Sequence, residues 1–247
     1  MDRLIYTAMS GMTDSMTRQR VLASNMANAQ TVGFRAEMLY STPVTLDGPS
    51  LQVRAMTEGE VRGADMSAGS ITETGRNLDV AITTGDAMLA VQADDGSEAY
   101  TRRGDLSISP TGVLENGDGK PVIGAGGPIT VPLGSNVTIS PDGAVLVGDP
   151  ATPDQPPTPV DKLKLASTAG SKIAKGLDGL FRVVGGGVLP GDENAKLQPG
   201  ALEQSNVKPS DVVVQMIQAQ RLFDIRTKLV STARDVDQSG ASLMRIS

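Results

Sequence analysis

The sequence predicts an α+β protein in which paired, coiled-coil-like helices at the two ends flank a central all-β domain inserted between them. Apolar residues recur at helical spacing at both ends of the 247-residue chain. Between the ends the period changes to two, and turn residues separate short apolar runs. We therefore divide the chain into an N-terminal helix at residues 1–30, an extended connector at 31–76, a β domain at 77–204 and a C-terminal helix at 205–247.

The N-terminal helix is predicted from Leu4 to about Ala29. Its apolar residues line one broad face, and Gly11 weakens its middle by roughly 1 kcal/mol relative to Ala. A helix of this kind gains most of its stability by packing that face on a partner. The residues that we expect at this interface are Ile5, Ala8, Met12, Leu22 and Met26.

The stretch "NMANAQTVGFRA" at residues 25–36 ends this helix and is predicted to be a joint. Asn25 and Asn28 carry short amides that can bond to the backbone of a fraying helix, and Thr31 can begin a turn. Gly33 can take a positive φ, and Phe34 then serves as an apolar anchor for the outgoing chain. An ordinary helix C-cap with a hydrophobic contact is the alternative. The connector that follows is rich in Thr, Gly and Ser.

The central region reads as many short strands. Runs such as "LDVAI", "AMLAV", "ITVP" and "AVLV" are separated by turns such as "DDG" and "SPDG". This spacing indicates an all-β domain of sandwich or barrel type rather than a βαβ fold. The segment Gly148 to Pro159 is predicted to be an exposed Pro-rich loop.

The C-terminal helix carries the strongest helical pattern in the chain. Pro209 suits a first helical turn and Asp211 complements the helix dipole. Three large apolar residues are then spaced by sevens, as in a coiled-coil seam. The residues that we expect at this interface are Met216, Leu222, Phe223, Leu229, Val230 and Val236.

Composition excludes several classes of function. The chain has no His and no Cys, which removes His-based triads, most zinc and haem sites and disulfides. We predict no catalytic residue, cofactor or metal site, and the acidic residues beside glycines read as solvated turns. The net charge of −6 and 2% aromatic content argue against nucleic-acid binding. No apolar run approaches 18 residues, so we expect neither membrane insertion nor a cleavable signal peptide.

Eight motifs occur in order along the chain: "MDRLIYTAMSGM", "NMANAQTVGFRAE", "TGRNLDVAI", "AYTRRGDL", "SPTGVLENGDGKPVIG", "ISPDGAV", "QPGALEQSNV" and "VVVQMIQAQRLFDIRTKLV". Together they resemble the axial proteins of the bacterial flagellum, the family of rod, hook and hook-associated proteins. The resemblance covers nearly the whole chain. Its most specific feature is that the blocks "NMANAQTVGF" and "EQSNV" occur together at opposite ends of the chain. The opening most resembles the proximal rod protein of the basal body, and the distal rod protein is the alternative.

The resemblance implies a structural subunit, not an enzyme, that polymerises into the hollow drive shaft transmitting torque. Its expected partners are copies of itself, other flagellar axial proteins and the flagellar type III export apparatus. Its expected place is the rod that crosses the periplasm, reached without a cleaved signal peptide. A secreted β-domain adhesin or carbohydrate-binding protein is the alternative from another class.

Overall fold

The computed structural model describes residues 2–45, 55–150 and 155–244, and the chain divides into two compact units. We call Met1–Ala27, Glu37–Gly63 and Lys208–Ser247 the helical unit. We call Asn28–Ala36 and Ala64–Val207 the β unit. The chain therefore crosses between the units at residues 27/28, 36/37, 63/64 and 207/208.

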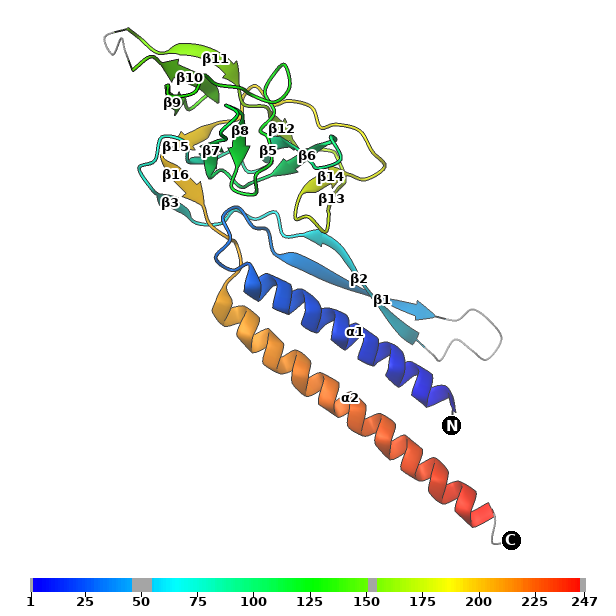
Figure 1. Ribbon diagram of the computed structural model, residues 1–247. Coiled ribbons are helices and arrows are strands. Elements are labelled where there is room, and N and C mark those ends of the chain that lie inside the picture. Colours follow the sequence, from blue (N-terminus) through cyan, green and yellow to red (C-terminus); the bar gives the residue numbers. More distant parts are fainter. Residues whose placement is uncertain (1, 46–54, 151–154, 245–247) are drawn as a thin grey trace. The chain divides into compact units, whose positions relative to one another are not determined.

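The helical unit is built from helices α1 (Asp2–Ala27) and α2 (Pro209–Met244) and strands β1 (Glu37–Thr45) and β2 (Ala55–Ala64). The helices run antiparallel, and α1 contacts both α2 and β1 (Figure 1). The two strands pair as a small sheet on the side of α1 away from α2. The predicted terminal helices are confirmed.

The connector that we expected at residues 31–76 contains more structure than its composition indicates. It forms β1 and β2, and then the short strand β3 (Ile71–Glu73), and it is divided between the two units. The start of β1 is fixed on α1 because Asn25 Nδ2 donates to the carbonyl of Glu37 at 3.0 Å and Asn25 Oδ1 accepts from the Glu37 N–H at 2.8 Å. Contacts between distant segments stabilise this hairpin, and local composition does not report them.

The β unit consists of short antiparallel strands in several small sheets. One sheet has the order β12-β5-β6-β14-β13, another has β11-β10-β9, and the pairs are β15-β4, β16-β3 and β7-β8. The bounds are β4 Val80–Ile82, β5 Ala87–Gln92, β6 Glu98–Thr101, β7 Leu106–Ile108, β8 Leu114–Asn116, β9 Asn136–Ile139, β10 Ala144–Gly148, β11 Thr158–Lys162, β12 Leu165–Ser167, β13 Ile173–Lys175, β14 Phe181–Val183, β15 Leu197–Pro199 and β16 Ala201–Glu203.

Strand β5 is buried on both faces, which explains its continuous apolar run. Leu89 and Val91 point into the main core with Leu106 and Leu114, whereas Met88 packs in a second cluster with Tyr100 and Phe181. The α+β class, with terminal helices flanking a β-rich region, is confirmed. Every strand pairing in the described part of the β unit is antiparallel, as expected for a region without βαβ units.

Proline residues explain a missing strand and the position of an edge strand in the β unit. The expected strand "ITVP" is absent, and Thr130 forms only an isolated bridge with Val113. Pro128 and Pro132, which have no N–H to donate, enclose this short run. The predicted Pro-rich loop is shorter than expected, because Gly148 ends β10 and β11 begins at Thr158; residues 151–154 of it lie outside the described residues. Pro159 lies in β11 at the edge of its sheet, where a missing donor is tolerated.

Candidate assembly interface

The helices α1 and α2 pack along one face of each. On α1 this face carries Gly11, Ser15 and Leu22, all of them buried. Arg226 of α2 reaches it and donates to the Gly11 carbonyl and to Ser15 Oγ. The side chains of α2 that are withdrawn from solvent repeat at Val212, Ala219, Phe223, Arg226, Val230 and Ala233, and we call this set the inner seam.

The predicted interface residues separate into two groups. Those that are buried or half-buried in this single chain are Ala8, Met12, Leu22, Phe223 and Val230. Those that are exposed are Met26, Met216, Leu222, Leu229 and Val236. The side chain of Ile5 lies outside the described residues.

The leucine-rich heptad therefore does not form the contact between α1 and α2. Leu222, Leu229 and Val236 are 38%, 46% and 49% exposed. The inner seam uses another face of α2, and smaller residues there allow the close approach of α1. These three residues stay predicted assembly residues, and within the described chain they do not pack on α1.

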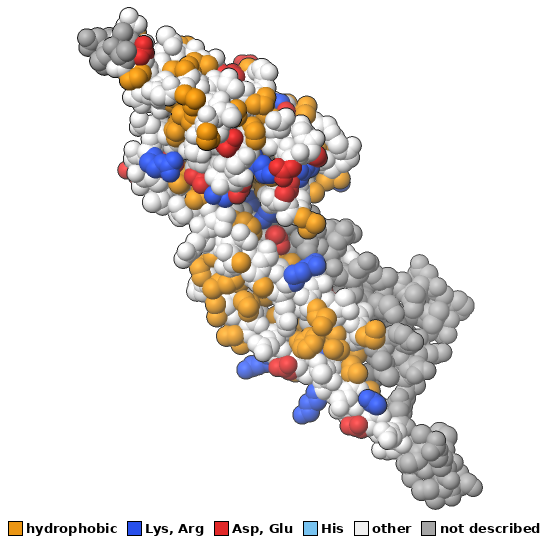
Figure 2. All heavy atoms as spheres, in the orientation of Figure 1, with side chains coloured by type: hydrophobic (Ala, Val, Ile, Leu, Met, Phe, Trp, Pro, Cys, Tyr) orange, Lys and Arg blue, Asp and Glu red, His pale blue; other side chains and the backbone are white. Residues whose placement is uncertain are grey.

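Helix α2 thus carries a second apolar stripe that nothing in the described chain covers. Its members lie within about 80° of one another around the helix, because successive residues turn by about 100°. Figure 2 shows hydrophobic side chains gathered on the surface of the helical unit. We call the following set the outer stripe: Val214, Leu222, Ile225, Leu229 and Val236.

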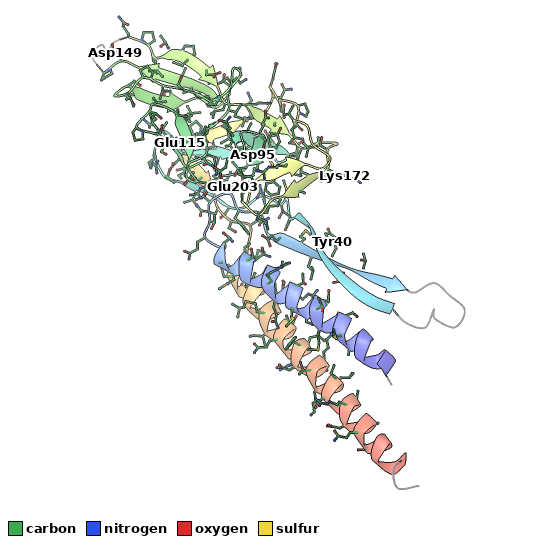
Figure 3. The ribbon with its side chains drawn as sticks, turned by 45° about the vertical axis from the view of Figure 1, so that its right-hand side comes forward. Tyr40, Asp95, Glu115, Asp149, Lys172 and Glu203 are labelled. Carbon is green, nitrogen blue, oxygen red and sulfur yellow. The ribbon has the colours of Figure 1, made fainter. Side chains whose placement is uncertain are left out.

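Helix α1 and strand β1 add further exposed apolar side chains. Met9 and Met16 are seven residues apart on α1 and are 60% and 57% exposed. Met38 and Tyr40 project from β1, where Figure 3 labels Tyr40. Exposed apolar groups in such number on one small unit are typical of a surface that binds other proteins.

The predicted joint residues fall in both units. Asn25, in the helical unit, is buried and bonds to β1 rather than to a frayed helix end. Asn28 and Thr31 bond to each other in the β unit, where Asn28 Oδ1 accepts from Thr31 Oγ1 at 3.2 Å. Gly33 lies six residues beyond the end of α1, so it is not the cap of that helix.

Gly33 is required by a close approach inside the β unit. Its φ is +67°, and an added Cβ would lie 2.4 Å from the carbonyl carbon of Arg102. Its N–H donates to the Glu203 carbonyl at 2.7 Å. Next to it, Phe34 is covered by Lys175, whose Nζ lies 3.5 Å from the ring centroid. The joint is thus a packed part of the β unit.

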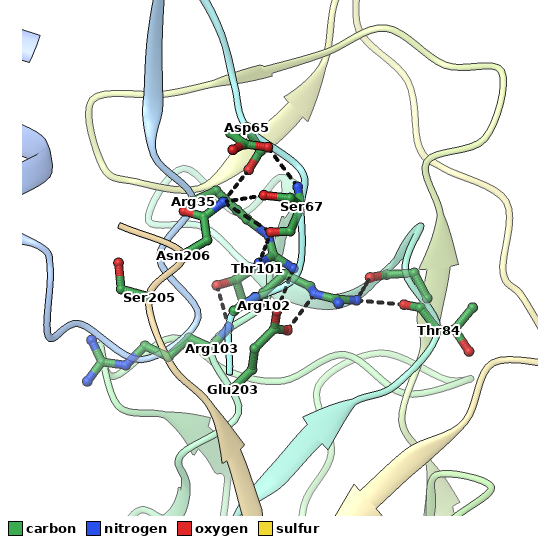
Figure 4. Close-up of polar contacts among 12 residues, drawn as sticks. Arg35, Asp65, Ser67, Thr84, Thr101, Arg102, Arg103, Glu203, Ser205 and Asn206 are labelled. Carbon is green, nitrogen blue, oxygen red and sulfur yellow. Dashed lines mark hydrogen bonds and ion pairs between the residues drawn. The ribbon is translucent and has the colours of Figure 1, made fainter. Parts of the chain in front are cut away.

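A buried ionic cluster lies beside Gly33 and was missed from the sequence (Figure 4). Arg35 Nη2 is 2.7 Å from Glu203 Oε1, and Arg102 Nε is 2.9 Å from Glu203 Oε2. The N–H of Gly69 also donates to Glu203 Oε1, at 2.9 Å. The arginines donate further to backbone carbonyls of Ser67, Thr84 and Ala87. Burial lowers the pKa of Arg102, and the charge of Glu203 opposes this shift.

Asn206 ties together three segments that lead to the helical unit. Its Oδ1 accepts from the Ala36 N–H at 2.8 Å, while its Nδ2 donates to the carbonyls of Asp65 and Ser67 at 2.8 and 3.0 Å. We call Arg35, Arg102, Glu203 and Asn206 the clasp. Three of the motifs quoted above supply its residues: "NMANAQTVGFRAE", "AYTRRGDL" and "QPGALEQSNV". The charged residues inside these motifs were the sequence signal from which a buried ionic cluster could have been predicted.

The described residues offer no group of three or more Asp and Glu side chains placed to hold a metal ion. None of the helices in that part of the chain is both long and apolar enough to span a membrane. The arrangement consists of exposed apolar stripes on helices and a buried ionic cluster in a β unit, which suits association with other chains.

Comparisons with known proteins identify the class. Three family models match: "Flagella basal body rod protein" at residues 5–35, "Flagellar hook protein FlgE/F/G D1 domain" at 81–147 and "Flagellar basal body rod FlgEFG protein C-terminal" at 198–243. Their order follows the N-terminal helix, the β unit and the C-terminal helix. The class is therefore that of the bacterial flagellar axial proteins.

Individual relatives sharpen this assignment. The chain is 41% identical to the flagellar basal-body rod protein FlgF of Salmonella typhimurium over 100% of both chains, and 41% identical to that of Escherichia coli over 95% of each. It is 32% identical to the rod protein FlgG of Bacillus subtilis over 98% of this chain and 99% of that one. The chain belongs to the flagellar basal-body rod protein family. It is a structural subunit of the rod, and the proximal rod is favoured over the distal rod.

Proposed function

We propose that this rod subunit assembles by burying the outer stripe of α2 against neighbouring axial subunits. The observation that carries the proposal is that α2 has two apolar faces and only the inner seam packs within the chain. A stripe that contacts a different patch on the next subunit makes a heterologous contact, and such contacts build open helical tubes.

The proposal includes coiled-coil-like packing of the helices in the assembled rod. The inner seam and the outer stripe both contain seven-residue repeats, which is the spacing that keeps a side-chain row facing a neighbouring helix. Met9 and Met16 on α1 supply a flexible surface that can adapt to more than one neighbour. The neighbours are further copies of this chain and other flagellar axial proteins.

The wider role follows from the rod family. We infer that the chain has no catalytic activity, leaves the cell through the flagellar type III apparatus without a cleaved signal peptide, and forms part of the shaft that crosses the periplasm and transmits torque. The absence of His and Cys from the chain supports a structural role, since the commonest catalytic and redox groups are missing.

The test is Leu229→Asp, produced in a bacterium that lacks the natural copy of the gene, with Ser231→Asp as the matched control. Both positions are exposed in the single chain, but only Leu229 belongs to the outer stripe. Hook-basal bodies are purified and the subunit in them is quantified. Leu229→Asp is expected to abolish incorporation, because a carboxylate cannot be buried unpaired without a large free-energy cost. Ser231→Asp is expected to incorporate normally.

Circular dichroism of the purified chains distinguishes assembly from folding. Because Leu229 does not pack on α1, its substitution should leave the helix content of the dilute chain unchanged. Normal rods built from Leu229→Asp would overturn the proposal. A loss of helix in the dilute chain would also overturn it, since the stripe would then be needed within one subunit.

A further inference from the structure

The inner seam contains one charged residue at its centre. Val212, Ala219, Arg226 and Ala233 follow one another at intervals of seven, so Arg226 occupies a position that a small apolar side chain fills elsewhere in the row. Its side chain is 26% exposed, which is low for an arginine on a two-helix surface. A charged group at such a position needs specific partners on the facing helix.

Arg226 contacts residues of α1 directly and is linked to β1 through one of them. Nη1 donates to the carbonyl of Gly11 and to Oγ of Ser15, whose side chain is almost fully buried. Asp14 Oδ2 lies 3.9 Å from the same nitrogen, and Asp14 Oδ1 accepts from Ser41 Oγ of β1 at 2.6 Å. Arg226 thereby links α2, α1 and the hairpin through one chain of polar contacts.

Gly11 provides the space for this contact. An added Cβ would lie 3.2 Å from Nε and 3.3 Å from Cζ of Arg226, closer than an ordinary contact allows. Glycine within a helix destabilises it by about 1 kcal/mol relative to alanine. Gly11 and Arg226 therefore explain each other. The glycine, which weakens α1, leaves room for the arginine, and the arginine, which interrupts the inner seam of α2, uses that room.

We propose that Arg226, seated over Gly11, fixes the axial register of α2 on α1. The facing surfaces also carry small residues, Ala8 on α1 and Ala219 and Ala233 in the inner seam, which would tolerate sliding of one helix along the other. The guanidinium finds its acceptors and the glycine gap at a single register, and sliding by one heptad would separate it from both. Single polar residues in the seams of helix pairs specify register in the same way.

This inference is independent of polymerisation, because it concerns contacts within one chain. Its consequence for the rod is geometric. The register sets the height of the outer stripe of α2 relative to Met9 and Met16 of α1, so every subunit presents the same surface to its neighbours. Arg226 is thus a positioning residue.

Cysteine cross-linking tests the register directly, because the chain has no natural Cys. The helices are antiparallel and Arg226 lies opposite Gly11 and Ser15, so Leu22 is expected opposite about Met216 in the observed register. The double variant Leu22→Cys with Met216→Cys reports this register. Leu22→Cys with Phe223→Cys reports a slip of one heptad.

In the chain that keeps Arg226, the first pair should oxidise faster than the second by about tenfold or more, since a disulfide requires the Cα atoms to be within roughly 7 Å. Arg226→Met removes the polar contacts but keeps a long apolar side chain, and it should bring the two rates to within about threefold of each other. Arg226→Lys keeps the charge and should preserve part of the difference.

Gly11→Ala is the second variant, chosen because it raises helix propensity while closing the gap that Arg226 uses. It should equalise the two rates without reducing the helix content measured by circular dichroism. Unchanged preference for the observed register in either Arg226→Met or Gly11→Ala would overturn the proposal. Loss of helix in Arg226→Met would also overturn it, because the residue would then supply stability rather than register.

Discussion

Arg102 Nε lies 2.9 Å from Glu203 Oε2, although 101 positions of sequence separate the two residues and both side chains are about 1% exposed. The contact joins the residue that follows β6 to the end of β16, the last strand before α2. Arg35 lies on the other carboxylate oxygen, so two buried arginines share one buried acid. The β unit can therefore be completed only when segments from both ends of the chain are in place.

Glu203→Gln is predicted to destabilise the β unit strongly. The amide keeps the shape of the carboxylate but removes the charge that Arg35 and Arg102 share, and uncompensated buried charges of this kind destabilise proteins by about 3 to 5 kcal/mol. The measurement is urea unfolding followed by tyrosine fluorescence. In a Tyr6→Phe, Tyr40→Phe background, Tyr100 of the β unit is the remaining reporter.

Glu73→Gln is the matched control for this prediction. Glu73 lies on β3, pairs in register with Ala201 of β16 and is exposed, so its substitution should change stability by no more than about 0.5 kcal/mol. If Glu203→Gln unfolded at the same urea concentration as Glu73→Gln, the clasp would contribute nothing to the stability of the fold.

Gly33→Ala and Gly75→Ala are predicted to differ, although both glycines have a positive φ, +67° and +73°. Alanine at either position carries the strain of left-handed backbone, about 1 to 2 kcal/mol. Only at Gly33 does the new Cβ also meet backbone atoms, since nothing lies within 4 Å at Gly75. Gly33→Ala should therefore be less stable than Gly75→Ala by about 2 kcal/mol or more. Equal losses in the same urea experiment would show that φ alone makes Gly33 necessary.

Asn206→Asp is predicted to weaken the tie between the segments at Ala36, Asp65 and Ser67. The carboxylate keeps the acceptor for the Ala36 N–H but loses the amide hydrogens and directs negative charge at two carbonyl oxygens. Leaving such groups unpaired destabilises a protein by about 1 to 3 kcal/mol. Asn136→Asp, at an exposed position of β9, is the control and should be close to neutral. The urea midpoints of the two variants give the comparison, and a neutral Asn206→Asp would contradict the role assigned to this amide.

The sequence predicted the terminal helices and the antiparallel strands because both depend on the spacing of nearby apolar residues. It did not predict which face of α2 meets α1. Leu222 and Leu229 are more apolar than Ala219 and Ala233, so they dominate a periodicity analysis, yet the close contact uses the smaller side chains. Periodicity reports that a stripe exists, whereas the identity of its neighbour depends on the size and polarity of the facing residues.

The clasp escaped prediction for a different physical reason. Arg35, Arg102 and Glu203 each stand among residues typical of exposed segments, and charged side chains are rarely buried unless they are paired. Their pairing is set by the path of the chain over long separations, which no local pattern encodes. No local pattern predicts the β1–β2 hairpin either, because Glu37 at the start of β1 is held by Asn25, which lies on α1.

Tyr100 is predicted to ionise at a higher pH than an unperturbed tyrosine. Burial raises the pKa of its phenol to about 12, with the neighbouring Glu98 acting in the same direction and the N–H of Leu189, which donates to the phenol oxygen, opposing it. Because the folded pKa lies above the unfolded value near 10, the neutral phenol stabilises the fold fully below about pH 10. This contribution is lost as the pH rises toward 12. Absorbance titration near 295 nm should show a late step that Tyr100→Phe removes and Tyr40→Phe leaves in place. If Tyr40→Phe removed the late step instead, the phenol of Tyr100 would not be held neutral by burial in the second core cluster.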